Sequence, residues 1–204
     1  MVREGFPFVI VPFAIAVVLA IFGWWLTAAV FVLIAAFMMY FFRDPHRDVP
    51  DKPGLIISAA DGRVTRIDEN ADDKTVSVFL SPLDVHINRS PIAGKILQVA
   101  YIHGHKKPAT SDKASLINER NSIVIEGDDM TVTCTQIAGI LARRIVCWPK
   151  VGDTLERGQR YGLIKFGSRT DIKMPLDCEV MVRVGDRVRG GETIIARRPS
   201  GGSL

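Results

Sequence analysis

The hydrophobic positions divide the chain into two parts with different patterns. From Gly5 to Phe42 there is no charged residue. As a single helix this stretch would be roughly 57 Å long, about twice the hydrocarbon core of a bilayer. The pattern therefore predicts two shorter apolar helices with a break near Gly23-Trp24-Trp25. We expect residues 1–47 to form a membrane anchor, a helical hairpin that spans twice or is re-entrant.

Two other interpretations of the apolar stretch are weaker. A cleaved signal peptide is disfavoured because the run is too long and no small-x-small site follows a short apolar core. A buried hairpin of a soluble protein is the remaining alternative. The run ends abruptly at Arg43-Asp44-Pro45-His46-Arg47. Positive residues flank the cytoplasmic ends of spans, so we expect a cell-membrane protein with its body on the cytoplasmic side.

Residues 48–204 show short β-type runs separated by turn residues, which predicts a mainly β body. Only Thr135–Arg143 suggests a short helix. The body holds the three cysteines, Cys134, Cys147 and Cys178, without any CxxC spacing. They are expected to be reduced thiols, in agreement with a cytoplasmic body.

One repeat lies in the C-terminal part. Residues 151–158 (VGDTLERG) recur 33 residues later as residues 184–191 (VGDRVRGG). Each copy is a Gly-Asp turn, a strand-like step and a glycine. The repeat resembles the half-motif of biotinyl and lipoyl carrier domains. The expected fold class is thus a mainly β body with a biotinyl/lipoyl-like duplicated β unit, preceded by an α-helical membrane hairpin.

Charge is unevenly distributed along the chain. The formal net charge is +4, but residues 139–204 hold 13 Lys/Arg against 7 Asp/Glu. A basic C-terminal third is typical of proteins with an anionic partner, whether a lipid headgroup, a nucleic acid or an acidic protein.

Few residues are candidates for chemistry, and each has a structural alternative. Ser168 follows Gly167 at the end of an apolar run, where a turn serine is the ordinary interpretation. Asp61 lies in Ala60-Asp61-Gly62 and is equally typical of a turn. His86 lies in a segment rich in hydrogen-bonding groups and framed by prolines, although most such histidines are structural. His103 and His105 have no further ligands nearby, so no metal is expected.

Five motifs occur in an order that resembles a known family. The chain is similar to the short form of the phosphatidylserine decarboxylase family, pyruvoyl-dependent enzymes made as proenzymes, over about residues 41–198. The motifs are Phe41-Phe42-Arg43-Asp44-Pro45, Ala60-Asp61-Gly62-Arg63-Val64, Ser81-Pro82-Leu83-Asp84-Val85-His86-Ile87-Asn88-Arg89, Asn118-Glu119-Arg120-Asn121 and Phe166-Gly167-Ser168-Arg169.

The resemblance implies self-cleavage between Gly167 and Ser168. A β chain (1–167) and an α chain (168–204) would form a heterodimer, with a covalent pyruvoyl group derived from Ser168. That group would form a Schiff base with the substrate amine. By the same resemblance His86 is the base, and Asp61 orients its imidazole as in a Ser-His-Asp triad. Decarboxylation needs such an electron sink, which no ordinary side chain supplies.

The resemblance also implies the partners. The substrate would be phosphatidylserine in the bilayer, whose product is phosphatidylethanolamine; no nucleic acid is expected, and a homo-oligomer is left open. Arg89 stands where long-form members carry a second histidine. Arg89 and Asn88 are candidate substrate-binding residues, because a guanidinium suits a carboxylate or phosphate.

Three other functions would leave the chain uncut. A membrane-anchored biotinyl/lipoyl-type carrier would bear its prosthetic group on Lys173. A membrane-bound serine hydrolase would use Ser168, His86 and Asp61, but no Gly-x-Ser-x-Gly elbow is present. A membrane protein without chemistry is the third.

Overall fold

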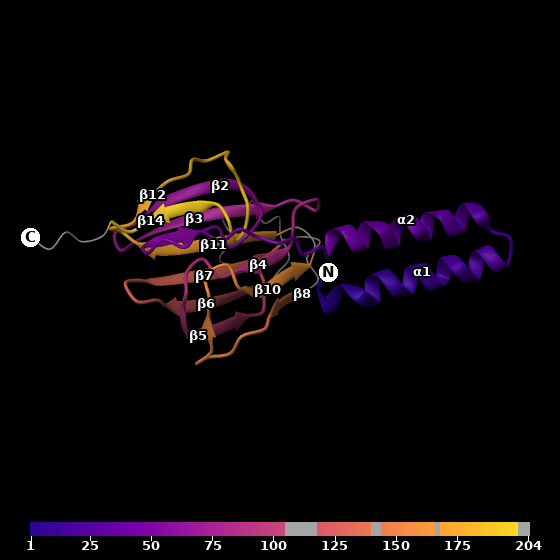
Figure 1. Cartoon of the computed structure of the whole chain (residues 1–204), viewed down its shortest axis with the longest axis horizontal. Helices are drawn as coiled ribbons and strands as arrows, with labels where there is room; N and C mark the ends of the chain where they lie inside the picture. The colour runs from indigo at the N-terminus through magenta and orange to yellow at the C-terminus, as the bar shows by residue number, and fades with distance from the viewer. Residues whose placement is uncertain (105–117, 140–143, 166–167, 200–204) are drawn as a thin grey trace, which may run out of the picture. The chain divides into compact units, whose positions relative to one another are not determined.

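The computed structural model describes residues 1–104, 118–139, 144–165 and 168–199. Within these ranges the chain forms two compact units, Met1–His46 and Arg47–Leu204. The first unit is helical and the second is built from strands (Figure 1). The predicted mainly β body with an apolar helical N-terminal part is confirmed.

The first unit is a pair of apolar helices that run side by side (Figure 1). A 3₁₀ turn (Arg3–Gly5) leads into α1 (Phe6–Ile21), and α2 (Trp25–Phe41) follows a short turn. The buried helical positions include Ala16, Ala28 and Ala35, small residues that allow close approach of two helices.

The composition of these helices suggests membrane association. Within the described residues, Arg3–Ile21 is the one helix that is long and apolar enough to cross a bilayer, and Trp25–Phe41 is apolar but shorter. Large apolar side chains such as Trp25, Leu26 and Leu33 are exposed on the helices. Such a surface is unfavourable in water and favourable in lipid.

Fourteen strands, most of them short, lie in the described part of the second unit. In chain order they are β1 (Leu55–Ile57), β2 (Gly62–Glu69), β3 (Asp73–Leu80), β4 (Ile87–Arg89), β5 (Gly94–Ile102), β6 (Arg120–Glu126), β7 (Thr131–Ala138), β8 (Arg144–Cys147), β9 (Thr154–Leu155), β10 (Arg160–Lys165), β11 (Ser168–Pro175), β12 (Glu179–Val180), β13 (Arg187–Val188) and β14 (Ile194–Arg197). The short helix predicted near Thr135–Arg143 is wrong for its described part, because β-branched and alternating residues continue β7 to Ala138.

The described strands form three sheets. An eight-stranded sheet has the order β13-β2-β3-β11-β7-β6-β5-β9, and three-stranded sheets have the orders β4-β10-β8 and β1-β14-β12. In the large sheet β11 lies between β3 and β7 and is antiparallel to both. Alternate residues of β3, β7 and β11, among them Val76, Cys134 and Ile172, face one apolar core that also includes Tyr161 of β10.

The two copies of the Val-Gly-Asp repeat adopt the same turn. In the first copy the backbone N–H of Lys150 donates to the Asp153 carboxylate at 2.7 Å. In the second copy the N–H of Arg183 donates to Asp186 at 2.8 Å. Each aspartate then accepts, through its carbonyl, a backbone bond from β5 or from β2 respectively. The repeated sequence therefore makes equivalent contacts with two different strands of the large sheet.

A second pair of segments also matches, and sequence analysis missed it. Ser58 and Ser90 each donate the hydroxyl to the carbonyl two residues farther along the chain, both at 2.7 Å. The carbonyl of each serine accepts a bond from the glycine that ends one copy of the repeat. Three residues after each serine stand Asp61 and Ala93. The same local contacts thus occur twice in the body, and only the first serine segment carries a carboxylate at this place.

Candidate active site

Ser168 is the first residue of β11, in the middle of the large sheet. It pairs with Leu80 on β3 and with Ala138 on β7. The side chain is fully buried, and its Oγ has no hydrogen-bond partner among the described residues. Buried polar atoms are normally hydrogen-bonded, so this hydroxyl is a candidate for chemistry.

The residues before Ser168 join two sheets. β10 ends at Lys165 in the sheet β4-β10-β8, and β11 begins at Ser168 in the large sheet. Only Phe166 and Gly167 separate the two strands, and both lie outside the described residues. Of the predicted cleavage site the structure therefore describes Ser168 alone.

The segment that carries His86 starts and ends beside this junction. Leu80, the β3 partner of the serine, ends its strand, and the His86 carbonyl accepts a bond from the Ile164 N–H on β10 at 3.2 Å. Between them, the Asp84 carboxylate accepts from the backbone N–H and the hydroxyl of Ser81 at 2.8 and 2.6 Å. These Ser81–Asp84 bonds close a tight turn. The turn lets the chain return to β10 within a few residues, so that His86 lies beside that strand.

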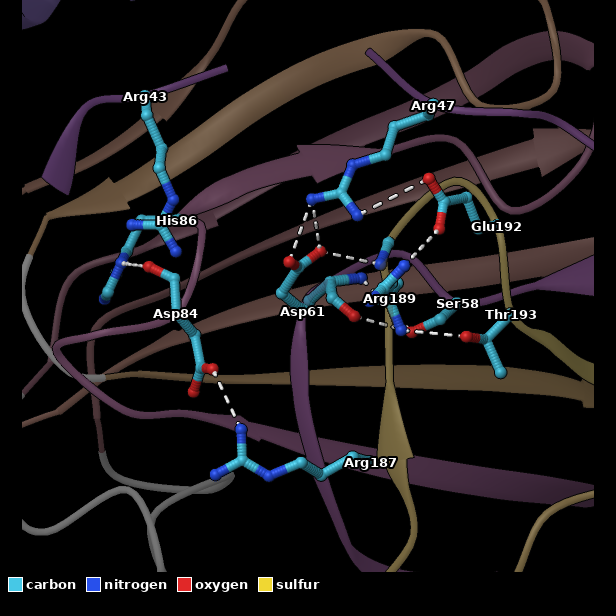
Figure 2. Close-up of polar contacts among 12 residues, drawn as sticks. Arg43, Arg47, Ser58, Asp61, Asp84, His86, Arg187, Arg189, Glu192 and Thr193 are labelled. Carbon is cyan, nitrogen blue, oxygen red and sulfur yellow. Dashed lines mark hydrogen bonds and ion pairs between the residues drawn. The ribbon is translucent and has the colours of Figure 1, made fainter. Parts of the chain in front are cut away.

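The His86 ring has a defined orientation. It is 2% exposed, and its Nδ1 lies 2.9 Å from the backbone oxygen of Asp84 (Figure 2). A carbonyl oxygen can only accept, so Nδ1 carries the hydrogen of the neutral imidazole. The basic lone pair is then on Nε2.

The Asp61 carboxylate accepts hydrogen bonds from a side chain and from a backbone N–H. Its Oδ2 and Oδ1 accept from one Arg47 nitrogen at 2.9 and 3.1 Å, and Oδ1 also accepts from the Gly190 N–H at 2.8 Å (Figure 2). Burial raises the pKa of Asp61 above its ordinary value, while Arg47 and the Gly190 N–H oppose that rise. A carboxylate with these partners is a positioned charge rather than a solvated turn residue.

The predicted contact between Asp61 and His86 stays a prediction. The Asp61 bonds described above go to Arg47 and Gly190, and the His86 Nδ1 lies beside a backbone carbonyl. Sequence reasoning missed Arg47 as a partner of Asp61. The signal for it was an arginine that recurs four residues after Arg43, directly behind the apolar run.

Asn88 and Arg89 both bond within the body. Asn88 is fully buried; its amide nitrogen donates to Thr170 Oγ1 at 3.0 Å, and its oxygen accepts from Gln136 at 2.9 Å. Arg89 is half-buried and donates from Nη1 to the Gly158 carbonyl at 3.0 Å. Asn88 therefore ties β4 to the large sheet, two residues along β11 from Ser168.

A second buried ion pair, also missed from the sequence, lies beside Ser168 on β11. Arg169 and Asp171 are both buried, and their side chains meet at 2.8 and 3.0 Å. Residues two apart on a strand share a face, so an Arg-x-Asp pattern within a strand could have indicated the pair. It lies on the opposite face of β11 from Ser168.

Lys173, the attachment residue of a carrier protein, is not at a hairpin tip. It lies within β11, where it pairs with β3 and β7, and its Nζ is 2.6 Å from Asp73. Carrier domains need their lysine at an exposed turn to swing the attached group, so this position disfavours that function.

Comparison with known proteins identifies relatives over nearly the whole chain. The family model described as phosphatidylserine decarboxylase matches residues 34–196. A protein of Symbiobacterium thermophilum named phosphatidylserine decarboxylase proenzyme is 48% identical over 206 residues, covering 97% of this chain and 95% of that protein. Proteins with the same name from Nitrosomonas europaea (45% over 201 residues; 95% and 93%) and Geotalea uraniireducens (40% over 203; 96% and 95%) are also similar. The resemblance predicted from the five motifs is confirmed.

Proposed function

The chain belongs to the phosphatidylserine decarboxylase family, and we propose that it cuts itself before Ser168 to make the pyruvoyl group with which it converts phosphatidylserine to phosphatidylethanolamine. The observation that carries this proposal is the buried Ser168 Oγ, which has no hydrogen-bond partner among the described residues. Ser168 is the first residue of β11, and the preceding strand, β10, belongs to a different sheet. A serine with a purely structural role would normally bond its hydroxyl there.

In the proposed first step Ser168 Oγ adds to the carbonyl carbon of Gly167 and the Ser168 nitrogen leaves, so that the peptide bond becomes an ester. Loss of the Ser168 α-proton then expels the Gly167 carboxylate and leaves dehydroalanine. Water converts this residue into a pyruvoyl group and ammonia. The products are the β chain, residues 1–167, and the α chain, residues 168–204.

We assign His86 as the base of these steps. With Nδ1 donating to the Asp84 carbonyl, Nε2 carries the lone pair that would take the hydroxyl proton of Ser168 and later return a proton to the product. Because the Asp84 carbonyl already accepts the Nδ1 hydrogen, Asp61 is proposed to act through its negative charge, which would stabilise the positive imidazolium. The bonds from Arg47 and Gly190 support an ionised Asp61, as that role requires.

When formed, the pyruvoyl group supplies a ketone that serves as an electron sink for the decarboxylation. The surroundings of residue 168 fit such a group, because the residue is buried and its paired neighbours Leu80 and Ala138 are apolar. Arg89 and Asn88 are the proposed substrate-binding residues. Arg89 is the better candidate, because a guanidinium has five donors and the Asn88 amide is engaged inside the fold.

The substrate is proposed to be taken from the bilayer. Phosphatidylserine stays in the membrane, and the apolar helices would hold the enzyme at its surface. Arg3 and Arg43 flank the helices at the ends that would face the cytoplasm, and the three cysteines are free thiols, which together favour a cytoplasmic body. The basic C-terminal third would favour an anionic headgroup.

We also propose that the repeated Val-Gly-Asp turn reflects a biotinyl/lipoyl-like duplicated unit. The equivalent turns at Asp153 and Asp186, with the equivalent bonds of Ser58 and Ser90, support an internal duplication.

The proposal is tested by the mass of the purified chain and by decarboxylation of phosphatidylserine in vesicles. We expect two fragments, of about 167 and 37 residues from the cleavage position, with the smaller one blocked at its N-terminus. Ser168→Ala should remain one chain without activity. Ser77→Ala is the matched control, because Ser77 Oγ is also buried without a partner among the described residues but follows no such junction.

Ser77→Ala should be cleaved and active. An active protein that remains in one piece with an ordinary serine at position 168 would overturn the proposal.

A further inference from the structure

Arg47 is the first residue of the β unit and its side chain is 6% exposed. Its guanidinium contacts both Asp61 oxygens, at 2.9 and 3.1 Å, and lies 3.8 Å from a Glu192 oxygen (Figure 2). The contact with Asp61 is a charge-assisted pair in a site nearly closed to solvent, where an ionic contact is stronger than at the surface.

A glycine turn packs against this arginine. Gly191 has φ +86°, which an L side chain rarely adopts, and a Cβ there would lie 2.8 Å from Arg89 Cδ and 3.4 Å from Arg47 Cγ. The neighbouring Gly190 gives its N–H to Asp61. The turn at 190–191, which would belong to the α chain, therefore encloses Arg47 and completes the bonds of Asp61.

From these contacts we infer that Arg47 is a positioning residue for self-cleavage: it keeps the Asp61 carboxylate ionised and in place while His86 takes the Ser168 proton. The inference rests on the proposed function, in which the Asp61 charge supports His86. Arg47 acts through Asp61 and contacts neither the serine nor the substrate in this role.

The charges around Asp61 set the expected pH dependence. Arg47 faces it from the segment before β1, Asp84 from the turn before β4, and Glu192 with Arg189 from the turn before β14. Burial and Asp84 raise the pKa of Asp61, and Arg47 is the largest opposing influence. Without Arg47 the pKa rises further, so Asp61 is protonated at a higher pH and cleavage is lost sooner as the pH falls.

The test compares full-length variants made by cell-free translation with phosphatidylserine-containing vesicles, with the loss of the uncut band followed over a range of pH. Arg47→Met keeps an unbranched apolar stem but removes the charge. We expect its cleavage to be about tenfold slower on the acid side for each unit by which the Asp61 pKa rises, and to recover as the pH is raised. In Arg47→Lys the cleavage rate should fall at nearly the same acid pH as in the wild type, because lysine retains the positive charge.

Two reference variants define the readout. Asp61→Asn should be slow at every pH, because no carboxylate can form. Arg66→Met removes the arginine of another Arg–Asp pair, with Asp68 at 2.6 Å, which is about one-third exposed. Its cleavage and pH profile should equal those of the wild type.

An Arg47→Met chain with the wild-type pH profile, or one slowed by the same factor at every pH, would overturn this inference while the proposed function stands. A wild-type chain that never cleaves would overturn both.

Discussion

His86 and Asp61 each depend on a backbone group for their orientation. The Asp84 carbonyl selects the tautomer of His86, and the Gly190 N–H holds one oxygen of Asp61. A backbone partner cannot be removed by a side-chain substitution. At the scale of the residue, mutation therefore tests the functional groups more cleanly than it tests what orients them.

His86→Gln should leave the precursor uncut. A general base accelerates a reaction by about 10²–10⁴-fold, and the side-chain amide of glutamine is not basic enough to replace it. The measurement is the fraction of uncut chain on a denaturing gel. His103→Gln, a substitution of an exposed histidine, is the control and should mature normally. Normal maturation and activity of His86→Gln would remove His86 from the mechanism.

At the scale of the element, a row of buried amides connects the sheets. Asn121 donates to Gln136 at 3.1 Å, Gln136 donates to Asn88 at 2.9 Å, and Asn88 donates to Thr170 at 3.0 Å. These bonds run from β6 through β7 and β4 to β11. They fix β4, and the His86 segment before it, relative to the strand that carries Ser168.

Gln136→Leu should lower the stability of the uncut Ser168→Ala protein by about 1–3 kcal/mol, because the Asn88 oxygen loses a donor and Asn121 loses an acceptor inside the core. Thermal or denaturant unfolding in detergent measures the change. Gln98→Leu, at an exposed position of β5, should have little effect. Equal stability of the two variants would show that the amide row contributes nothing.

The glycine turn offers a second comparison. Gly191→Ala and Gly152→Ala both place a side chain at positive φ, at a cost of about 1–2 kcal/mol. Only at Gly191 would the new Cβ meet neighbours, because nothing lies within 4 Å at Gly152. Gly191→Ala should therefore unfold at a lower temperature and also cleave more slowly, since Arg47 and Arg89 must shift. Matching behaviour of the two variants would contradict the packing role of Gly191.

Periodicity and turn residues predicted where the strands and turns lie better than they predicted which residues contact one another in the site. The alternation at residues 75–80 and 121–126 and the repeat at 151–158 and 184–191 could be recognised in the sequence because they are local. The helix expected around Thr135–Arg143 is wrong for its described part, because pairing on both sides keeps residues 135–138 in β7. The five ordered motifs identified Ser168, His86 and Asp61 as candidates, but Arg47 and Gly190 reach Asp61 from 14 residues before and 129 residues after it. The arginine four residues after Arg43 could be noticed in the sequence, but no local pattern connects it to Asp61.

At the scale of the whole molecule, the proposed cut divides the large sheet through its middle without breaking a strand pair. β11 would belong to the α chain, and it pairs along its length with β3 and β7 of the proposed β chain, while β13 and β14 pair with β2 and β1. The two chains should therefore elute together in native size-exclusion chromatography and separate only in denaturant. Release of the small chain in native buffer would contradict this arrangement.

Because β11 lies in the centre of the large sheet, the proposed cut would change how the unfolded enzyme refolds. An uncut polypeptide regains its sheet by an intramolecular search, whose rate is independent of protein concentration. Once divided, the same sheet can re-form only when a 37-residue fragment finds a second molecule, so reassembly becomes second order and slows on dilution. The cut would therefore make unfolding harder to reverse than it is for the single chain. The resistance of the mature enzyme to heat should depend on a slow unfolding rate rather than on efficient refolding.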